Sequence, residues 1–203
     1  MRDIQENFLN TSYLNINMNI QDIKKRIRTI PHFPKKGIMF RDITPLLQDP
    51  FTRRYVLLTI EEHFKDKRID AVVAAESRGF IFGSILAHEM YCSFVPLRKP
   101  GKLPYKTIKQ EFQTEYSIDA FEMHEDGIKK GQNVLIADDL LATGGTAEAA
   151  CKLVERLGGN VVGVAFIIDL SYLGGREKLK KYDVFSVIDY KSEEEDVEPE
   201  LLQ

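Results

Sequence analysis

One stretch of the sequence, residues 133–157, constrains the fold more than any other. It opens with a short apolar run, Val134–Ala137, of the kind that fills a strand buried on both faces. Two carboxylates, Asp138 and Asp139, follow at the point where that strand should end. A turn of small residues, 142–146, then leads into an amphipathic helix that stops at a glycine pair. The pattern therefore predicts a strand, an acidic pair, a glycine turn and a helix in succession.

The glycine turn has the composition of an anion-binding loop. Glycines let the backbone approach a ligand and leave several N–H groups pointing into one concavity. The helix behind the turn adds the positive end of its dipole, which favours a phosphate monoester. The residues expected to contact the phosphate are Ala142, Thr143, Gly144, Gly145 and Thr146. The acidic pair suits sugar hydroxyls, a Mg²⁺ ion or a developing positive charge, because a carboxylate repels phosphate. The alternative is a glycine-rich connection that binds no ligand.

Apolar runs alternate with helical patterns along the chain. Strands are expected at 70–75, 93–97, 115–123, 134–137, 160–169 and 184–190, and helices at 20–30, 51–67, 83–90 and 147–157. This alternation is typical of an α/β fold with a mostly parallel, twisted sheet and helices on both faces. Residues 31–47 hold two early prolines and Gly37, which exclude a regular helix, yet they are apolar enough to act as a cover. Residues 105–113 are polar and show no period.

Two further loops at the ends of predicted strands carry positive charges. Arg78 lies in the turn 76–80, Glu-Ser-Arg-Gly-Phe, at the carboxyl end of a strand, where open α/β sheets bind ligands. Arg98, Lys99 and Lys102 lie in a stiff turn that also contains two prolines and a glycine. A ligand with several negative charges needs such a group, since one arginine does not balance it. The alternative for each cation is an ordinary solvated surface charge.

Length and composition fit one soluble domain. A chain of 203 residues with a net charge of −3 has no general attraction to nucleic acid or to an anionic membrane. The sequence has no apolar run long enough to span a bilayer and no signal-peptide pattern at its start, so the cytoplasm is the expected compartment. The two cysteines are interpreted as core residues, and the four scattered histidines predict no zinc site. Residues 1–19 form an extension, and the acidic tail 191–203 has the composition of a disordered segment.

Four segments together resemble the type I phosphoribosyltransferases, and among them the adenine phosphoribosyltransferases. They are the motif 133–146, the turn 76–80, Arg-Lys-x-Gly-Lys-Leu-Pro at 98–104, and Phe-Pro-x-x-Gly-Ile-x-Phe-Arg-Asp-Ile-Thr-Pro-Leu-Leu at 33–47. The resemblance covers residues 20–190 as a single domain. It implies the type I phosphoribosyltransferase fold, with a small hood at 31–47 and a flexible lid loop at about 102–116. It also implies a glycosyltransferase that uses Mg²⁺, acts as a homodimer, and makes AMP and diphosphate from adenine and 5-phosphoribosyl 1-diphosphate in purine salvage.

The same resemblance assigns roles to individual residues. The implied catalytic residues are Arg78, Glu115, Asp138 and Asp139, with Glu115 as a proton donor or hydrogen-bond partner for the base. The diphosphate is expected to meet Glu76, Ser77, Arg78, Arg98, Lys99 and Lys102, and the base and lid to involve Met39, Arg41, Tyr116 and Leu140. A non-proline cis peptide is expected in the loop that holds Glu76 and Ser77. From the residues alone, Glu115 and Tyr116 are an ordinary pair in a strand.

Two alternatives stay open. One is a phosphoribosyltransferase for hypoxanthine, guanine or xanthine, which would need groups that read a 6-oxo edge. The other is a regulator that senses a phosphoribosyl ligand without chemistry, for which a DNA-binding appendage would be expected. The sequence shows no such appendage, and the lid, the cations and the acidic pair favour an enzyme.

Overall fold

A computed structural model describes residues 18–113 and 118–195 of the chain. The described residues form two compact units, one of residues 18–55 and one that begins at residue 56. None of the described helices is both long and apolar enough to cross a membrane.

The first unit contains short elements. They are α2 (Ile20–Lys24), β1 (Arg28–Pro31), β2 (Met39–Asp42), α3 (Thr44–Gln48) and the first residues of α4 (Pro50–Phe64). Asn19 caps α2 in a capping box with Asp22. The predicted helix over 20–30 was wrong in its second half, because Arg28–Pro31 pairs as an antiparallel strand with β2. Arg41 is buried on β2, and its guanidinium donates a hydrogen bond to the Thr29 hydroxyl.

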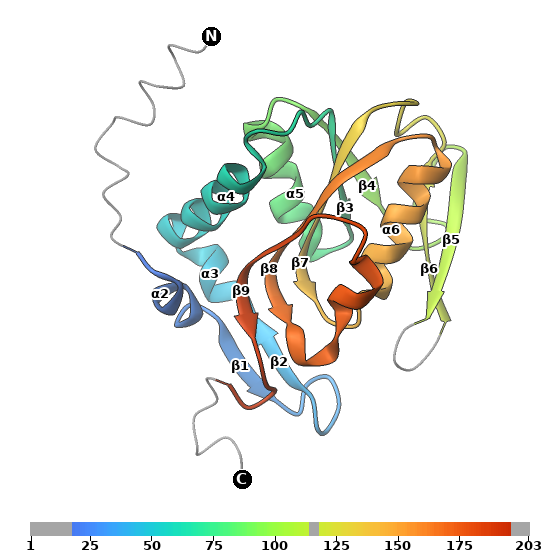
Figure 1. Cartoon of the computed structure of the whole chain (residues 1–203). Coiled ribbons are helices and arrows are strands. Elements are labelled where there is room, and N and C mark those ends of the chain that lie inside the picture. Colours follow the sequence, from blue (N-terminus) through green and yellow to red (C-terminus); the bar gives the residue numbers. More distant parts are fainter. Residues whose placement is uncertain (1–17, 114–117, 196–203) are drawn as a thin grey trace, which may run out of the picture. The chain divides into compact units, whose positions relative to one another are not determined.

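The second unit is built on a five-stranded sheet in the order β4-β3-β7-β8-β9, in which all neighbours are parallel (Figure 1). The strands are β3 (Ala71–Ala75), β4 (Ser93–Leu97), β7 (Asn133–Leu141), β8 (Asn160–Leu170) and β9 (Val184–Tyr190). The apolar runs of the sequence predicted all five. Every residue of β3 is buried, as expected for a parallel strand covered on both faces. The predicted α/β fold with a mostly parallel sheet is confirmed.

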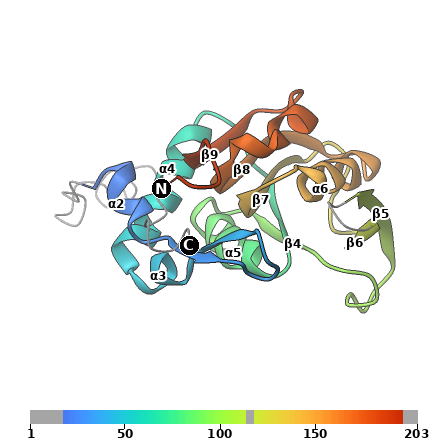
Figure 2. The same ribbon diagram turned by 90° about the horizontal axis from the view of Figure 1, so that it is seen from below.

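Helices cover both faces of this sheet. On one face, α5 (Arg78–Glu89) packs on β3 so closely that a Cβ on Gly83 would lie 2.5 Å from the Cβ of Ala74. On the other face, α6 (Gly145–Arg156) contributes Ala147, Ala150 and Val154 to a core cluster that includes Val73 from β3. Seen from below, α5 lies beside β4, and α6 lies beside a separate ribbon (Figure 2).

That ribbon is an antiparallel pair of β5 (Thr107–Gln113) and β6 (Ile118–His124). The sequence predicted no strand at 105–113, and this was wrong: exposed and half-buried residues alternate along most of β5, and its residues pair one by one with β6. Strand β6 also does not join the large sheet; it meets the end of β4 through one bridge between Arg98 and Glu122. Two short 3-10 helices, η1 (Ser171–Leu173) and η2 (Gly175–Leu179), connect β8 to β9.

Candidate active site

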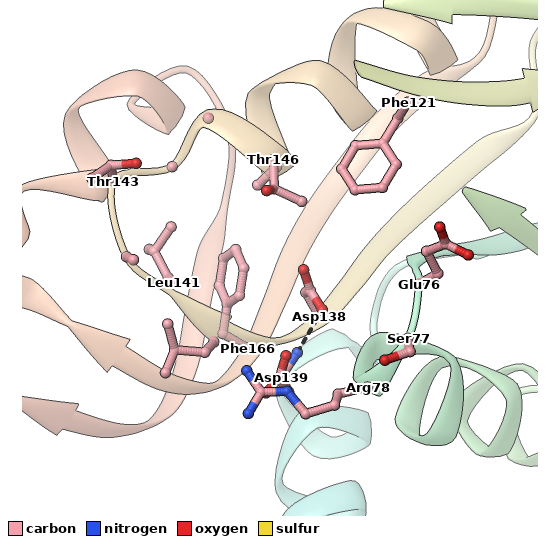
Figure 3. A pocket seen from close by; sticks show the side chains of 15 residues that line it. Glu76, Ser77, Arg78, Phe121, Asp138, Asp139, Leu141, Thr143, Thr146 and Phe166 are labelled. Carbon is pink, nitrogen blue, oxygen red and sulfur yellow. Dashed lines mark hydrogen bonds and ion pairs between the residues drawn. The ribbon is translucent and has the colours of Figure 1, made fainter. Parts of the chain in front are cut away.

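A cleft of about 370 Å³ lies at the carboxyl ends of β3 and β7, entirely within the second unit (Figure 3). Parallel sheets commonly bind ligands at this edge. The lining residues are Glu76, Ser77, Arg78, Phe121, Asp138, Asp139, Leu140, Leu141, Ala142, Thr143, Gly144, Gly145, Thr146, Ala147 and Phe166. The cleft thus brings together the acidic pair, the glycine turn and the loop after β3, which lie far apart in the sequence.

The glycine turn forms the start of α6. Gly144 is the N-cap residue and has a left-handed backbone (φ 78°), which favours glycine at this position. Gly145 lies against the end of β5, where an added Cβ would come within 2.8 Å of the carbonyl oxygen of Gln113. The N-terminus of a helix of 12 residues therefore opens into the cleft, with its unpaired amides and dipole available to an anion.

The acidic pair lies between the glycine turn and Arg78 (Figure 3). The backbone N–H of Asp139 donates to Asp138 Oδ1 at 2.9 Å, and Arg78 Nε lies 3.0 Å from Asp139 Oδ2. Burial and the neighbouring charge of Asp139 raise the pKa of Asp138 well above its usual range. Burial also raises the pKa of Asp139, although the Arg78 charge opposes that shift. The pair therefore favours a ligand that supplies hydroxyl groups or positive charge.

Glu76 holds the basic turn that follows β4. Its Oε2 accepts from Arg98 Nε at 2.9 Å, and its Oε1 accepts from Lys102 Nζ at 2.9 Å and from the backbone N–H of Lys99 at 3.0 Å. Burial alone would raise the pKa of Glu76, but these three donors lower it to about 2. Glu76 is therefore ionised and paired with these cations. If it affects a bound diphosphate, it does so by holding the basic turn and not by direct contact. The Lys99 ammonium pairs with Asp119 at 2.9 Å.

The expected cis peptide is present between Glu76 and Ser77. Met39 and Arg41 lie on β2 in the first unit, and Glu115 and Tyr116 lie outside the described residues, so the roles of these four stay predictions. Sequence reasoning missed Phe121 and Phe166, which line the cleft from β6 and β8. Their only signal was membership of apolar strand patterns, which does not distinguish a cleft wall from a core.

The described residues contain no group of three or more metal-binding side chains. Two adjacent carboxylates in a cleft fit a Mg²⁺ ion that takes most of its ligands from a phosphorylated substrate and water. Asp138 and Asp139 are therefore the residues that would face such an ion.

Comparison with known proteins identifies the family. The family model described as the phosphoribosyl transferase domain matches residues 55–202. The adenine phosphoribosyltransferase of Methanococcus vannielii is 51% identical over 169 residues, which cover 83% of this chain and 98% of that relative. The chain belongs to the adenine phosphoribosyltransferase family.

Solved structures of this family share the fold. The adenine phosphoribosyltransferase of Thermoanaerobacter pseudethanolicus is 47% identical, with a TM-score of 0.83 over 85% of this chain and 100% of that chain. The adenine phosphoribosyltransferase of Saccharomyces cerevisiae, solved with an imino-altritol bisphosphate and adenine, is 40% identical, with a TM-score of 0.78 over 83% of this chain and 98% of that chain. The type I phosphoribosyltransferase fold expected from the sequence is thereby confirmed.

Proposed function

We propose that the chain transfers the ribose phosphate of 5-phosphoribosyl 1-diphosphate to adenine, releasing AMP and diphosphate. The bond between C1′ and the diphosphate oxygen breaks with its electron pair on the diphosphate, while a bond forms between C1′ and N9 of adenine, which loses its proton. The observation that carries the proposal is one cleft in which a helix N-terminus, a carboxylate pair and an arginine face one another. The choice of adenine as the base is supported by the Saccharomyces cerevisiae member of the family, whose structure was solved with adenine bound.

The glycine turn is the proposed binding site of the 5′-phosphate. Its amides lie at the N-terminus of α6, and the hydroxyls of Thr143 and Thr146 line the same cleft. This contact is remote from the reacting carbon. Its binding energy can therefore hold the sugar in a reactive geometry, and such positioning supplies a large share of the rate in transfers of this type.

The carboxylates and the cations divide the charge that develops as the bond breaks. Positive charge builds on the ribose ring, where Asp138 or Asp139 can stabilise it, and negative charge builds on the diphosphate. Arg78 is the cation of the cleft itself, and Arg98 and Lys102 form the basic turn held by Glu76. A Mg²⁺ ion facing Asp138 and Asp139 would neutralise charge on the substrate oxygens. The base is expected to meet Met39, Arg41, Leu140 and Tyr116, with Glu115 handling a proton on adenine.

One assay tests the proposal. The protein is incubated with 5-phosphoribosyl 1-diphosphate, Mg²⁺ and one base at a time from adenine, hypoxanthine, guanine and xanthine, and diphosphate release is followed. We expect release with adenine alone. Release only with a 6-oxo purine would support the alternative purine transferase. Binding of the sugar diphosphate without release for any base would support the regulator. Size-exclusion chromatography with light scattering tests the accompanying proposal of a homodimer, and cell fractionation tests the cytoplasmic location.

A further inference from the structure

The glycine turn rests on the backbone of η2. A Cβ on Gly144 would lie 2.5 Å from the carbonyl oxygen of Gly175, and a Cβ on Gly175 would collide with the carbonyl oxygen of Ala142. Both glycines are buried, so two backbone segments meet here without side chains between them. A shift in the position of η2 is therefore passed directly to the turn.

Arg176, the next residue of η2, fixes this segment to the edge of the sheet formed by β8 and β9. Its Nε pairs with Asp169 Oδ2 on β8, one guanidinium nitrogen donates to the carbonyl oxygen of Val184 at 2.9 Å, and the other donates to Ser186 Oγ at 2.6 Å. All three acceptors belong to β8 or β9. A guanidinium fork can make these bonds at once, whereas an ammonium group acts as a single point charge.

Asp169 is a buried carboxylate that costs stability, and it lies beside the glycine turn. It is fully buried, and its Oδ1 has no hydrogen-bond partner within the described part of the chain. Burial raises the pKa of Asp169 even though Arg176 opposes the shift. Asp169 pairs in register with Leu141, the residue that directly precedes the glycine turn. A buried carboxylate with one unsatisfied oxygen destabilises a fold, so the ion pair is poorly explained by stability alone.

We propose that Asp169 and Arg176 are positioning residues that set the glycine turn through η2, and so determine affinity for the terminal phosphate of a phosphorylated sugar. This inference rests on the proposed function in placing that phosphate on the turn. The pair acts on one end of the substrate only. The basic turn at Arg98–Lys102 is held separately by Glu76, so affinity for free diphosphate should not depend on Arg176.

The test measures two affinities by calorimetry, one for ribose 5-phosphate and one for diphosphate, in the wild-type protein and in Arg176→Met. We expect the dissociation constant for ribose 5-phosphate to rise at least tenfold and that for diphosphate to stay within twofold. Arg176→Lys should fall between the two proteins, because it keeps the charge and loses the fork. Should Arg176→Met fail to fold, Arg176→Lys and Gly175→Ala carry the test, since the added methyl group presses on Ala142 directly.

Lys67→Met is the matched control. Lys67 also pairs with a carboxylate, Asp183, and donates to a strand carbonyl, that of Val162 at 2.8 Å, but it does so from the connection between α4 and β3 and not from η2. It should lower stability and leave both affinities within twofold. Wild-type affinity for ribose 5-phosphate in the Arg176 variants, or an equal loss of both ligands, would overturn the inference. A wild-type protein that binds ribose 5-phosphate but releases no diphosphate with any base would remove the proposed function and leave this inference standing. A wild-type protein that does not bind ribose 5-phosphate would remove both.

Discussion

Glu76→Gln isolates the charge that holds the basic turn. Glutamine has nearly the volume of glutamate and keeps one carbonyl acceptor, but it cannot form ion pairs with Arg98 and Lys102. The Glu76 side chain is 8% exposed, so few waters can replace the lost charge. The substitution therefore tests electrostatics rather than packing.

The pKa of Glu76 gives the magnitude. A value of about 2, against about 4.3 for an unperturbed glutamate, means that the folded protein favours the ionised side chain by about 3 kcal/mol. Lys102 is 49% exposed, and water screens its part of the interaction. We therefore expect Glu76→Gln to lower the free energy of unfolding by roughly 1–3 kcal/mol at pH 7.

The pH dependence has a definite sign. Because the folded-state pKa of Glu76 is lowered, its stabilisation is complete above about pH 5 and is lost as the pH falls toward 2. Urea unfolding of the wild type and Glu76→Gln at several pH values should show a stability difference that shrinks over this range. Glu111→Gln is the control, since Glu111 is 63% exposed in its pair with Lys109 and should change stability by less than about 0.5 kcal/mol. A difference that stays constant from pH 7 to pH 3 would refute the reasoning.

The same variant should bind diphosphate more tightly. Removing a negative charge beside the cations removes a repulsion on the order of 2 kcal/mol per unit charge, for an assumed separation of about 8 Å and an effective dielectric constant of about 20. Freeing two side chains opposes this by roughly 1 kcal/mol each. Diphosphate carries several charges, so the electrostatic effect should win. Calorimetric titration with diphosphate checks this, and weaker binding would mean that Glu76 acts mainly by ordering the turn.

Three further predictions concern the cleft and the proposed lid. Asp138→Asn should lower turnover by about 10²–10³-fold. It should also raise the free energy of unfolding at pH 7, because the raised pKa of Asp138 means that its ionised form is unfavourable in the folded protein. Near-wild-type turnover in this variant and in Asp139→Asn would remove the acidic pair from the mechanism. Glu115→Gln should lower turnover and leave affinity for 5-phosphoribosyl 1-diphosphate largely intact, and loss of affinity alone would make Glu115 a structural part of the lid. Gly145→Ala should raise the KM for 5-phosphoribosyl 1-diphosphate, since the new Cβ would lie 2.8 Å from the carbonyl oxygen of Gln113; steady-state kinetics with an unchanged KM would contradict a tightly packed turn.

The sheet was predictable because parallel strands buried on both faces are nearly continuous apolar runs. Ala71–Ala75 and the start of β7 are such runs, and the structure has strands there. The glycine turn was also predictable, because its geometry depends only on neighbouring residues, namely Gly144 and the helix that follows it.

The errors arose where a distant partner decides the structure. Isoleucines at 20, 23, 27 and 30 fit a helical repeat, yet Arg28–Pro31 finds a strand partner in β2. Likewise, Thr107–Gln113 is too polar to look like a strand until β6 pairs with it. Ion pairs were hidden for the same reason, because Glu76 meets Arg98 and Lys102 across 22 and 26 residues of sequence.

Two helices begin beside the cleft, and each has a glycine in its first turn that leaves room for a negatively charged group. Gly145 opens α6 toward the space where a phosphate is proposed to bind. Gly79, in the first turn of α5, admits a carboxylate of the chain itself, since a Cβ there would lie 2.6 Å from Asp138 Oδ1. The N-terminus of α5 favours a negative charge beside it, and so partly offsets the burial of the acidic pair. The parallel order of β3 and β7 makes this possible, because it sets the two helix N-termini at one edge of the sheet, where one can hold the acids and the other is left for the ligand.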